Sequence, residues 1–348
     1  MPKLSENSCP QRVGKTSALM ELIYSGSLSQ AAYVAAELGI ADHLASGPRD
    51  AGELARATGS HAPSLHRLLR TLTGIELCTE REDGTFALGP MGSLLSSDAP
   101  DSLRSRFLHW GKYQWPVWGN LLYSVQTGES ARNLATGTDG FKHLERDAEA
   151  AEVFNRSRVG MTRFVAADVV QAYDFSGVRR IVDVGGGHGA LLAVVLEAHP
   201  DMQGVLFDMQ HAMEGAQVYM ANARLSKRCE CIAGSFFEAV PAGADAYVLK
   251  GVIHDWNDEQ SAVILRNCRR AIPQDGKLLL VERIMPARLE ATPRHHAIAQ
   301  ADLTMLLGPG GRERTETEFR ILLESTGFRP TRFIATALEY SIVEGIPS

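Results

Sequence analysis

The second half of the chain, from Arg179 onward, alternates short apolar runs with segments of helical periodicity. Each apolar run has the length and composition of a buried strand. Regular alternation of strands and helices is typical of a doubly wound, Rossmann-like α/β sheet, in which parallel strands lie side by side and helices cover both faces. The predicted strands are 181–184, 204–208, 229–233, 246–250, 277–282, 331–335 and 340–344, and the predicted helices are 191–198, 212–224, 259–271 and 316–325.

The first hundred residues have a different pattern. Amphipathic helices are predicted at 31–39, at 50–59 and from Ala62, and a small hairpin follows between Leu77 and Leu88. Three helices and a hairpin are the outline of a winged helix-turn-helix. Residues between these two regions are mainly helical and contain three of the four tryptophans. We therefore expect a winged-helix-like dimerisation domain over 1–100, a helical connector that contributes to a substrate pocket over 101–175, and an α/β domain over 176–348.

Charge argues against nucleic acid as the main partner. The chain carries 35 Lys and Arg against 41 Asp and Glu, a net charge of −6. Residues 1–100 contain eight basic and eleven acidic side chains, so their net charge is −3. A helix that reads a DNA groove usually lies in a basic field, which replaces the phosphate counterions. A role in packing or dimer formation is therefore favoured for this domain, and DNA binding stays as the remote alternative.

Cysteine usage and the N-terminal segment indicate a cytoplasmic protein. The five cysteines are odd in number and have no paired CxxC spacing, so the sequence predicts neither a disulfide framework nor a zinc site. The first 17 residues lack the apolar core of a signal peptide. No stretch reaches the roughly 18 apolar residues of a membrane span, so we expect no membrane partner.

A glycine-rich turn, Asp183–Gly189, follows the first strand of the α/β region and opens a helix. Glycines at this place let backbone N–H groups approach a nucleotide-like ligand closely. Asp208, at the end of the next strand, is placed to bind ribose hydroxyls. Dinucleotides and S-adenosylmethionine both use such turns, and the glycine spacing fits both. An acid two positions before the first glycine, here Asp183, belongs to the methyltransferase form.

Two later segments help to decide between a dinucleotide and S-adenosylmethionine as the ligand. Lys250–Asp258 contains Lys-x-x-x-His-Asp-Trp, and Gly310–Thr315 reads Gly-Gly-x-Glu-Arg-Thr. With the glycine turn, they resemble the plant caffeic-acid type O-methyltransferases and their bacterial small-molecule relatives, over essentially the whole chain. The resemblance implies S-adenosylmethionine as cofactor and metal-independent methyl transfer to a hydroxyl of an aromatic small molecule, a phenolic or polyketide-like secondary metabolite. It also implies a homodimer formed through the N-terminal domain.

The resemblance makes His254 the general base, with Glu282 and Glu313 beside it and Asp255 next to it in the chain. The chemistry agrees with this assignment. A phenol with a pKa near 10 is a poor nucleophile at neutral pH, and a histidine within hydrogen-bond reach can take its proton as the methyl group transfers. A carboxylate beside the imidazole sets its tautomer and stabilises the imidazolium.

The resemblance also assigns residues to the cofactor and to the acceptor. Ser235 stands where the family usually has an aspartate near the adenine amine; because a hydroxyl can still accept that hydrogen bond, we expect weaker binding of the cofactor and not its loss. The predicted cofactor residues are Asp183, Gly185, Gly187, Asp208, Ser235, Phe236, Lys250 and Thr162. The predicted acceptor pocket contains Trp110, Phe154, Met161, Trp256 and Met305, each of which could equally be a core residue.

Several alternatives stay open at this point. The same base could serve an acidic N–H or an activated carbon, so N- or C-methylation is possible. A relative could also keep the cofactor for non-methylating chemistry of a hydroxylase or decarboxylase kind, although His254, Glu282 and Glu313 together argue against it. A nicotinamide-dependent oxidoreductase is a distant alternative.

Overall fold

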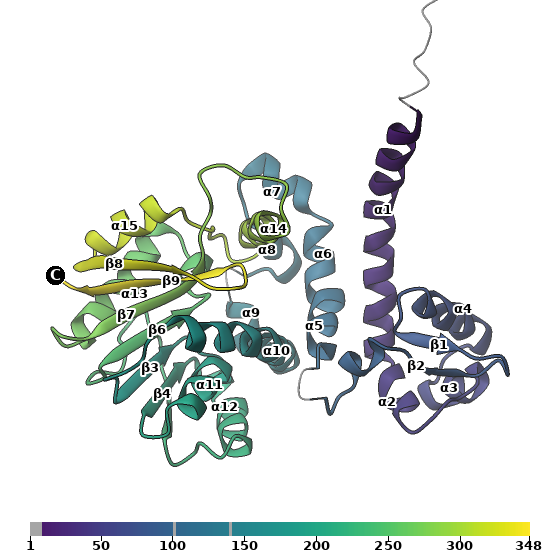
Figure 1. Cartoon of the computed structure of the whole chain (residues 1–348), viewed down its shortest axis with the longest axis horizontal. Helices are drawn as coiled ribbons and strands as arrows, with labels where there is room; N and C mark the ends of the chain where they lie inside the picture. The colour runs from purple at the N-terminus through teal and green to yellow at the C-terminus, as the bar shows by residue number, and fades with distance from the viewer. Residues whose placement is uncertain (1–8, 100–101, 139–140) are drawn as a thin grey trace, which may run out of the picture. The chain divides into compact units, whose positions relative to one another are not determined.

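The computed structural model describes residues 9–99, 102–138 and 141–348 (Figure 1). The chain forms two compact units, Met1–Gln114 and Trp115–Ser348, and the predicted connector is divided between them. Each unit has its own hydrophobic core. Within the described ranges, no helix combines the length and the apolar character needed to cross a membrane.

The N-terminal unit contains the predicted helices and hairpin. Asp50 caps the third helix: Glu53 N donates to Asp50 Oδ1 at 2.8 Å, and Asp50 N donates to Glu53 Oε2 at 3.0 Å. Leu54, Leu69 and Phe86 form the centre of its core. The elements are α1 (Cys9–Glu37), α2 (Ile40–Ala45), α3 (Ala51–Thr58), α4 (Ala62–Thr73), β1 (Cys78–Glu80), β2 (Phe86–Leu88), η2 (Gly92–Leu95), α5 (Arg104–His109) and the π-helical turn η3 (Trp110–Gln114).

Helix α1 is much longer than the predicted helix at 31–39. Its first half exposes apolar side chains, among them Leu19, Leu22 and Ile23, each about two-thirds exposed. These side chains do not form a core-facing stripe within one chain, so the sequence pattern does not predict this half of the helix.

A seven-stranded sheet forms the centre of the C-terminal unit. The strand order is β5-β4-β3-β6-β7-β9-β8, and the first five strands of this order are parallel. Strand β9 runs antiparallel to both neighbours, because a short connection after β8 allows a hairpin and leaves no room for a crossover. The strands are β3 (Arg180–Val184), β4 (Gln203–Asp208), β5 (Cys229–Ala233), β6 (Ala246–Lys250), β7 (Lys277–Arg283), β8 (Phe328–Ala335) and β9 (Tyr340–Pro347).

Helices cover both faces of this sheet, as predicted (Figure 1). Neighbouring strand residues point to opposite faces: Ile181 packs with α10, α11 and α12, and Val182 packs with α13 and α15. Helix α14 was not predicted. The helices are α6 (Trp115–Trp118), α7 (Leu121–Thr127), α8 (Ala131–Thr136), α9 (Lys142–Arg146), α10 (Ala148–Ala172), α11 (Ala190–Ala198), α12 (Gln210–Asn222), η4 (Ile253–Asp255), α13 (Asp258–Ala271), α14 (Pro293–Leu307) and α15 (Glu316–Glu324).

Candidate active site

A cavity of about 540 Å³ lies in the C-terminal unit, beyond the carboxyl ends of β3, β4 and β6. This is the edge of an open α/β sheet at which ligands usually bind, and the volume is in the range of small-molecule sites. The predicted site residues that line the cavity are Phe154, Thr162, Asp183, Gly185, Gly187, Asp208, Ser235, Phe236, Lys250, His254, Asp255 and Trp256.

The glycine turn leaves β3 in a backbone conformation that few other residues adopt. Gly185 and Gly187 have φ values of 72° and 59°. A Cβ atom at Gly185 would also lie 2.9 Å from Cγ2 of Val252. The backbone N–H of Gly187 donates to Oδ2 of Asp208 at 2.6 Å, so the end of β4 holds the turn in place. The turn therefore presents bare backbone to the cavity.

Two carboxylates beside this turn, the buried Asp183 and the half-buried Asp208, have unused hydrogen-bonding capacity. Asp183 is 1% exposed, and its Oδ2 has no hydrogen-bond partner among the described residues. Burial, with the charge of Asp208 added, raises the pKa of Asp183 to about 7. Asp208 accepts N–H bonds from Gly187 and Met209, one on each oxygen, which leaves lone pairs on both. A ligand with an ammonium group and ribose hydroxyls would supply the missing donors. These residues thus fit S-adenosylmethionine.

A lysine and a threonine that line the same cavity are hydrogen-bonded to each other. Lys250, the last residue of β6, donates from Nζ to Oγ1 of Thr162 on α10 at 2.9 Å. Burial lowers the pKa of Lys250 to about 7. An ammonium group that donates to a hydroxyl and lies 5.6 Å from the centre of the Tyr340 ring is well suited to hold the carboxylate of a bound ligand.

Aromatic rings form another wall of the cavity. Phe237 and Trp256 meet edge to face with ring centroids 4.7 Å apart, and Phe236 lies 5.0 Å from Phe237. The hydroxyl of Ser235 accepts an N–H bond from Phe237 at 3.3 Å. Such a wall can hold flat rings by stacking and by burial of apolar area.

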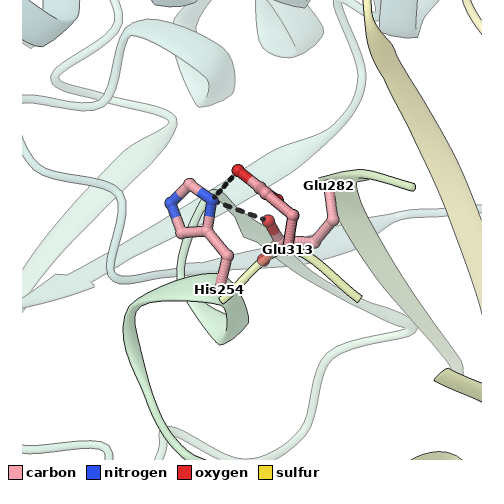
Figure 2. Close-up of side chains that lie close together, drawn as sticks. All are labelled: His254, Glu282 and Glu313. Atoms are coloured by element: carbon pink, nitrogen blue, oxygen red, sulfur yellow. Dashed lines mark hydrogen bonds and ion pairs between the residues drawn. The ribbon is translucent and has the colours of Figure 1, made fainter. Parts of the chain in front are cut away.

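His254 is held in the turn η4, directly after β6, and is 4% exposed. Its Nδ1 lies 3.0 Å from Oε1 of Glu313 and 3.6 Å from Oε2 of Glu282. Figure 2 shows both contacts on the same ring nitrogen. The second nitrogen, Nε2, is 3.6 Å from Oδ1 of Asp255, too far for a hydrogen bond. Glu313 therefore sets the ring orientation and leaves Nε2 available to a ligand.

The charges around His254 determine its protonation. Burial lowers the pKa of this imidazole, but the carboxylates of Glu313, Glu282 and Asp255 outweigh burial and raise it to about 9. Burial raises the pKa values of Glu282 and Asp255. In the free protein the histidine is thus an imidazolium at neutral pH, paired with Glu313.

The two glutamates differ in a way that their sequence positions did not reveal. Glu282, at the end of β7, accepts N–H bonds from Val252 at 3.1 Å and Ile253 at 2.8 Å, so it holds the turn that carries the histidine. Glu313 contacts the ring itself. One donor atom each of His254, Glu282 and Glu313 lie within 4.8 Å of one another, a spacing at which a cation could also bind.

The Gly-Gly-x-Glu-Arg-Thr segment packs directly on this turn. Arg312 N donates to the carbonyl oxygen of His254 at 2.8 Å. Arg314 is fully buried and donates to the carbonyl oxygens of Ile253 at 2.8 Å and Trp256 at 2.7 Å. Arg314 is a positioning residue that sequence reasoning missed.

Three residues predicted for the acceptor pocket do not line the cavity. Met161 directly precedes Thr162 on α10, so its side chain leaves the helix on another face, and it is 38% exposed. Met305 is buried within α14. Trp110 belongs to the N-terminal unit, and its contact with an acceptor stays a prediction.

Other residues line the cavity without having been predicted, notably Asn155, Arg158 and Tyr340. Asn155, Arg158 and Thr162 follow one another at helical spacing on α10. This spacing can be read from the sequence. It indicates that Asn155 and Arg158 line the cavity only once Thr162 is known to line it.

Family comparisons cover both units. A family model described as an O-methyltransferase domain matches residues 118–329, and one described as an O-methyltransferase dimerisation domain matches residues 20–98. Phenazine O-methyltransferase PhzM of Lysobacter antibioticus is 42% identical over 344 residues, which cover 99% of this chain and 100% of that protein.

Solved structures of O-methyltransferases are similar to this chain as well. The crystal structure of LaPhzM superimposes with a TM-score of 0.92 at 42% identity, over 96% of this chain and 99% of the other. The O-methyltransferase NcsB1 from neocarzinostatin biosynthesis, in complex with S-adenosylmethionine and 2-hydroxy-5-methyl naphthoic acid, has a TM-score of 0.76 at 33% identity, over 92% and 96% of the two chains.

Proposed function

Because this chain belongs to the O-methyltransferase family, and is therefore an S-adenosylmethionine-dependent methyltransferase, we propose that it methylates a hydroxyl of an aromatic small molecule with His254 as general base. One observation carries the proposal: Nδ1 of a buried histidine is held by Glu313 at 3.0 Å, and the ring lines the cavity that the glycine turn also lines. The base and the cofactor residues thus face one space.

The chain's own residues do three things in this mechanism. Lys250, Thr162, Asp183 and Asp208 would bind the polar groups of the cofactor, and the aromatic wall and the glycine turn would enclose it. S-adenosylmethionine, when bound, supplies a methyl group activated by a sulfonium. His254 takes the hydroxyl proton of the acceptor on Nε2, and Glu313 stabilises the imidazolium that results. Alignment of the acceptor oxygen supplies much of the remaining acceleration.

The pKa of His254 suits this proton transfer. A value of about 9 is close to that of a phenol, about 10, so the transfer to the neutral ring costs little free energy. The neutral ring is the minor form at pH 7, so we expect turnover to rise with pH until the imidazolium has titrated.

The acceptor class follows from the cavity wall and from the relatives. Phe236, Phe237 and Trp256 favour a flat ring. PhzM is named for phenazine, and NcsB1 was solved with a naphthoic acid. A fused aromatic ring system with a hydroxyl is the acceptor that these observations favour.

We also propose that the protein is a homodimer. The match to a dimerisation domain over residues 20–98 and the exposed apolar side chains Leu19, Leu22 and Ile23 of α1 support this. Light scattering should give about twice the chain mass of 37.8 kDa; the mass of one chain at assay concentration would contradict it.

Product mass tests the proposed activity. The protein is incubated with S-adenosylmethionine, a chelator and 1-naphthol, 1-hydroxy-2-naphthoate or 1-hydroxyphenazine, and each O-methylated compound serves as a matched acceptor without a free hydroxyl. We expect a gain of one CH₂ unit from a hydroxylated acceptor and no reaction of its O-methylated partner. Loss of a carboxyl group or gain of an oxygen atom would indicate the non-methylating alternative. Activity lost with the chelator would indicate a metal at His254.

Glu313→Gln should move the pH profile to lower pH. The negative charge of Glu313 raises the pKa of His254, so its removal lowers that pKa and makes the neutral base available at lower pH. The rising limb of kcat/KM, near pH 9 in the wild type, should shift toward the ordinary histidine value of about 6.5. The maximal rate should fall, because the ring loses its orienting carboxylate.

Glu316→Gln is the control for this shift, since Glu316 is half-exposed and pairs with Arg320. Its profile should match that of the wild type. An unchanged rising limb in Glu313→Gln would contradict the assignment of that limb to His254.

A further inference from the structure

An arginine that the proposed mechanism does not use lines the cavity. Arg158 lies on α10, one turn after Asn155 and one turn before Thr162, and all three line the cavity. Its guanidinium carbon lies 4.9 Å from the centre of the Phe154 ring, a cation–π distance. The guanidinium therefore has a fixed place on the cavity wall.

The guanidinium of Arg158 forms no ion pair with any residue of the described ranges, and its printed contact is the Phe154 ring. Burial is the largest influence on the pKa of each of Lys250, Asp255 and Tyr340, and the positive charge of Arg158 lowers all three. Since these residues come from β6, η4 and β9, the guanidinium is within electrostatic reach of three separate cavity walls.

A second arginine adds to the positive charge near Asp255. Arg132 on α8 is 7% exposed, and its Nη1 has no hydrogen-bond partner among the described residues. The charges of Arg132 and Arg158 both lower the pKa of Asp255, which burial raises. The charges of two guanidinium groups thus act on one carboxylate, while Glu282 and Glu313 contact His254. Arg158 is the one of the two arginines that lines the cavity, so it can pair with an anionic group of a ligand there.

We propose that Arg158 binds a carboxylate of the acceptor, so that the preferred acceptor of this enzyme is an aromatic hydroxy acid. The inference rests on the proposed function and adds the substrate class to it. A guanidinium presents parallel N–H donors that match a carboxylate in a bidentate way. Because Arg158 and His254 line the same cavity, one acceptor can place its carboxylate at the guanidinium and its hydroxyl at the imidazole.

The test compares 1-hydroxy-2-naphthoate with its methyl ester, which has the same ring and hydroxyl but no negative charge. Both the KM in turnover and the Kd for protein saturated with S-adenosylhomocysteine are measured. The acid should have KM and Kd values roughly tenfold to a hundredfold lower than the ester, as expected for a charge-assisted bidentate pair.

Arg158→Met should remove this preference: the KM and Kd of the acid should rise and those of the ester should not change. Methionine keeps apolar contact with Phe154 but lacks the charge. Arg158→Lys should keep part of it, because a lysine retains the charge but loses the bidentate geometry. Arg156→Met is the matched control: Arg156 is two residues away on the same helix, exposed, and paired with Glu152. It should retain the full preference.

Several outcomes would overturn the inference. Equal binding of acid and ester, or binding of neither, would show that the wild-type cavity does not select a carboxylate. If Arg158→Met lowered the affinities for acid and ester equally, the guanidinium would contact a group that both compounds have, and not the carboxylate. A matching loss of S-adenosylhomocysteine affinity would assign Arg158 to the cofactor. Turnover of a neutral phenol is measured as well, because it does not need Arg158. If the neutral phenol is methylated, the results above concern Arg158 alone; if it is not, the proposed function itself fails.

Discussion

His254→Ala is expected to lower kcat by roughly 10²- to 10⁴-fold, the usual contribution of a general base, and to leave the affinity for S-adenosylhomocysteine unchanged. The imidazole is the group whose free nitrogen is available to take the hydroxyl proton, while Asp183, Asp208, Lys250 and Thr162 remain to hold the cofactor. Single-turnover mass spectrometry measures the first effect, and calorimetric titration measures the second.

Two further variants test whether the effect of His254→Ala is specific to the loss of the base. His296→Ala changes an exposed histidine of α14 and should not alter turnover or binding. His254→Asn keeps a polar side chain in the turn, so it separates loss of the base from collapse of the site. Turnover near the wild-type rate in either His254 variant would contradict the assignment of the base.

Gly311→Ala is expected to be nearly as damaging, although Gly311 is not proposed to touch a ligand. A Cβ atom there would lie 2.0 Å from the carbonyl oxygen of His254, 2.5 Å from the carbonyl carbon of Asp255 and 2.7 Å from the backbone nitrogen of Trp256. These are backbone atoms, so they cannot rotate away as a side chain would. The turn η4 must shift, and the histidine moves with it.

We expect Gly311→Ala to lower kcat/KM roughly a hundredfold, since a displacement of about 1 Å can have that effect, and to lower the free energy of unfolding by about 1–3 kcal/mol. Gly310→Ala is the matched control. Gly310 has a φ of 86° but no atom within 4 Å of its built Cβ, so the change costs about 1–2 kcal/mol of backbone strain without displacing the turn. If Gly311→Ala kept the activity of Gly310→Ala, the close packing of this segment on η4 would not matter for catalysis.

The elements that could be predicted from the sequence are those whose signals are local. Helices separate most of the strands from β3 to β8, and the glycine turn lies where β3 ends. These features could be predicted because buried strands, caps and tight turns each leave a mark within a few residues. The cap at Asp50 is one such mark. The gathering of His254, Glu282 and Glu313 was inferred only through the family resemblance.

The features that could not be predicted depend on contacts between distant residues. No local pattern separates Glu282, which holds the backbone of Val252 and Ile253, from Glu313, which holds the imidazole. The same is true of Arg314, whose partners lie more than 50 positions earlier in the chain. The first half of α1 gave no core-facing pattern, because its apolar face is exposed in the single chain.

The position of the transferred methyl group tests the central claim most directly. The measurement is ¹³C NMR of the product formed from an aromatic hydroxy acceptor and S-adenosylmethionine labelled with ¹³C in its methyl group. The account predicts the label on an oxygen attached to the aromatic ring. A label on nitrogen or carbon, or no labelled product from protein that binds S-adenosylhomocysteine, would contradict it.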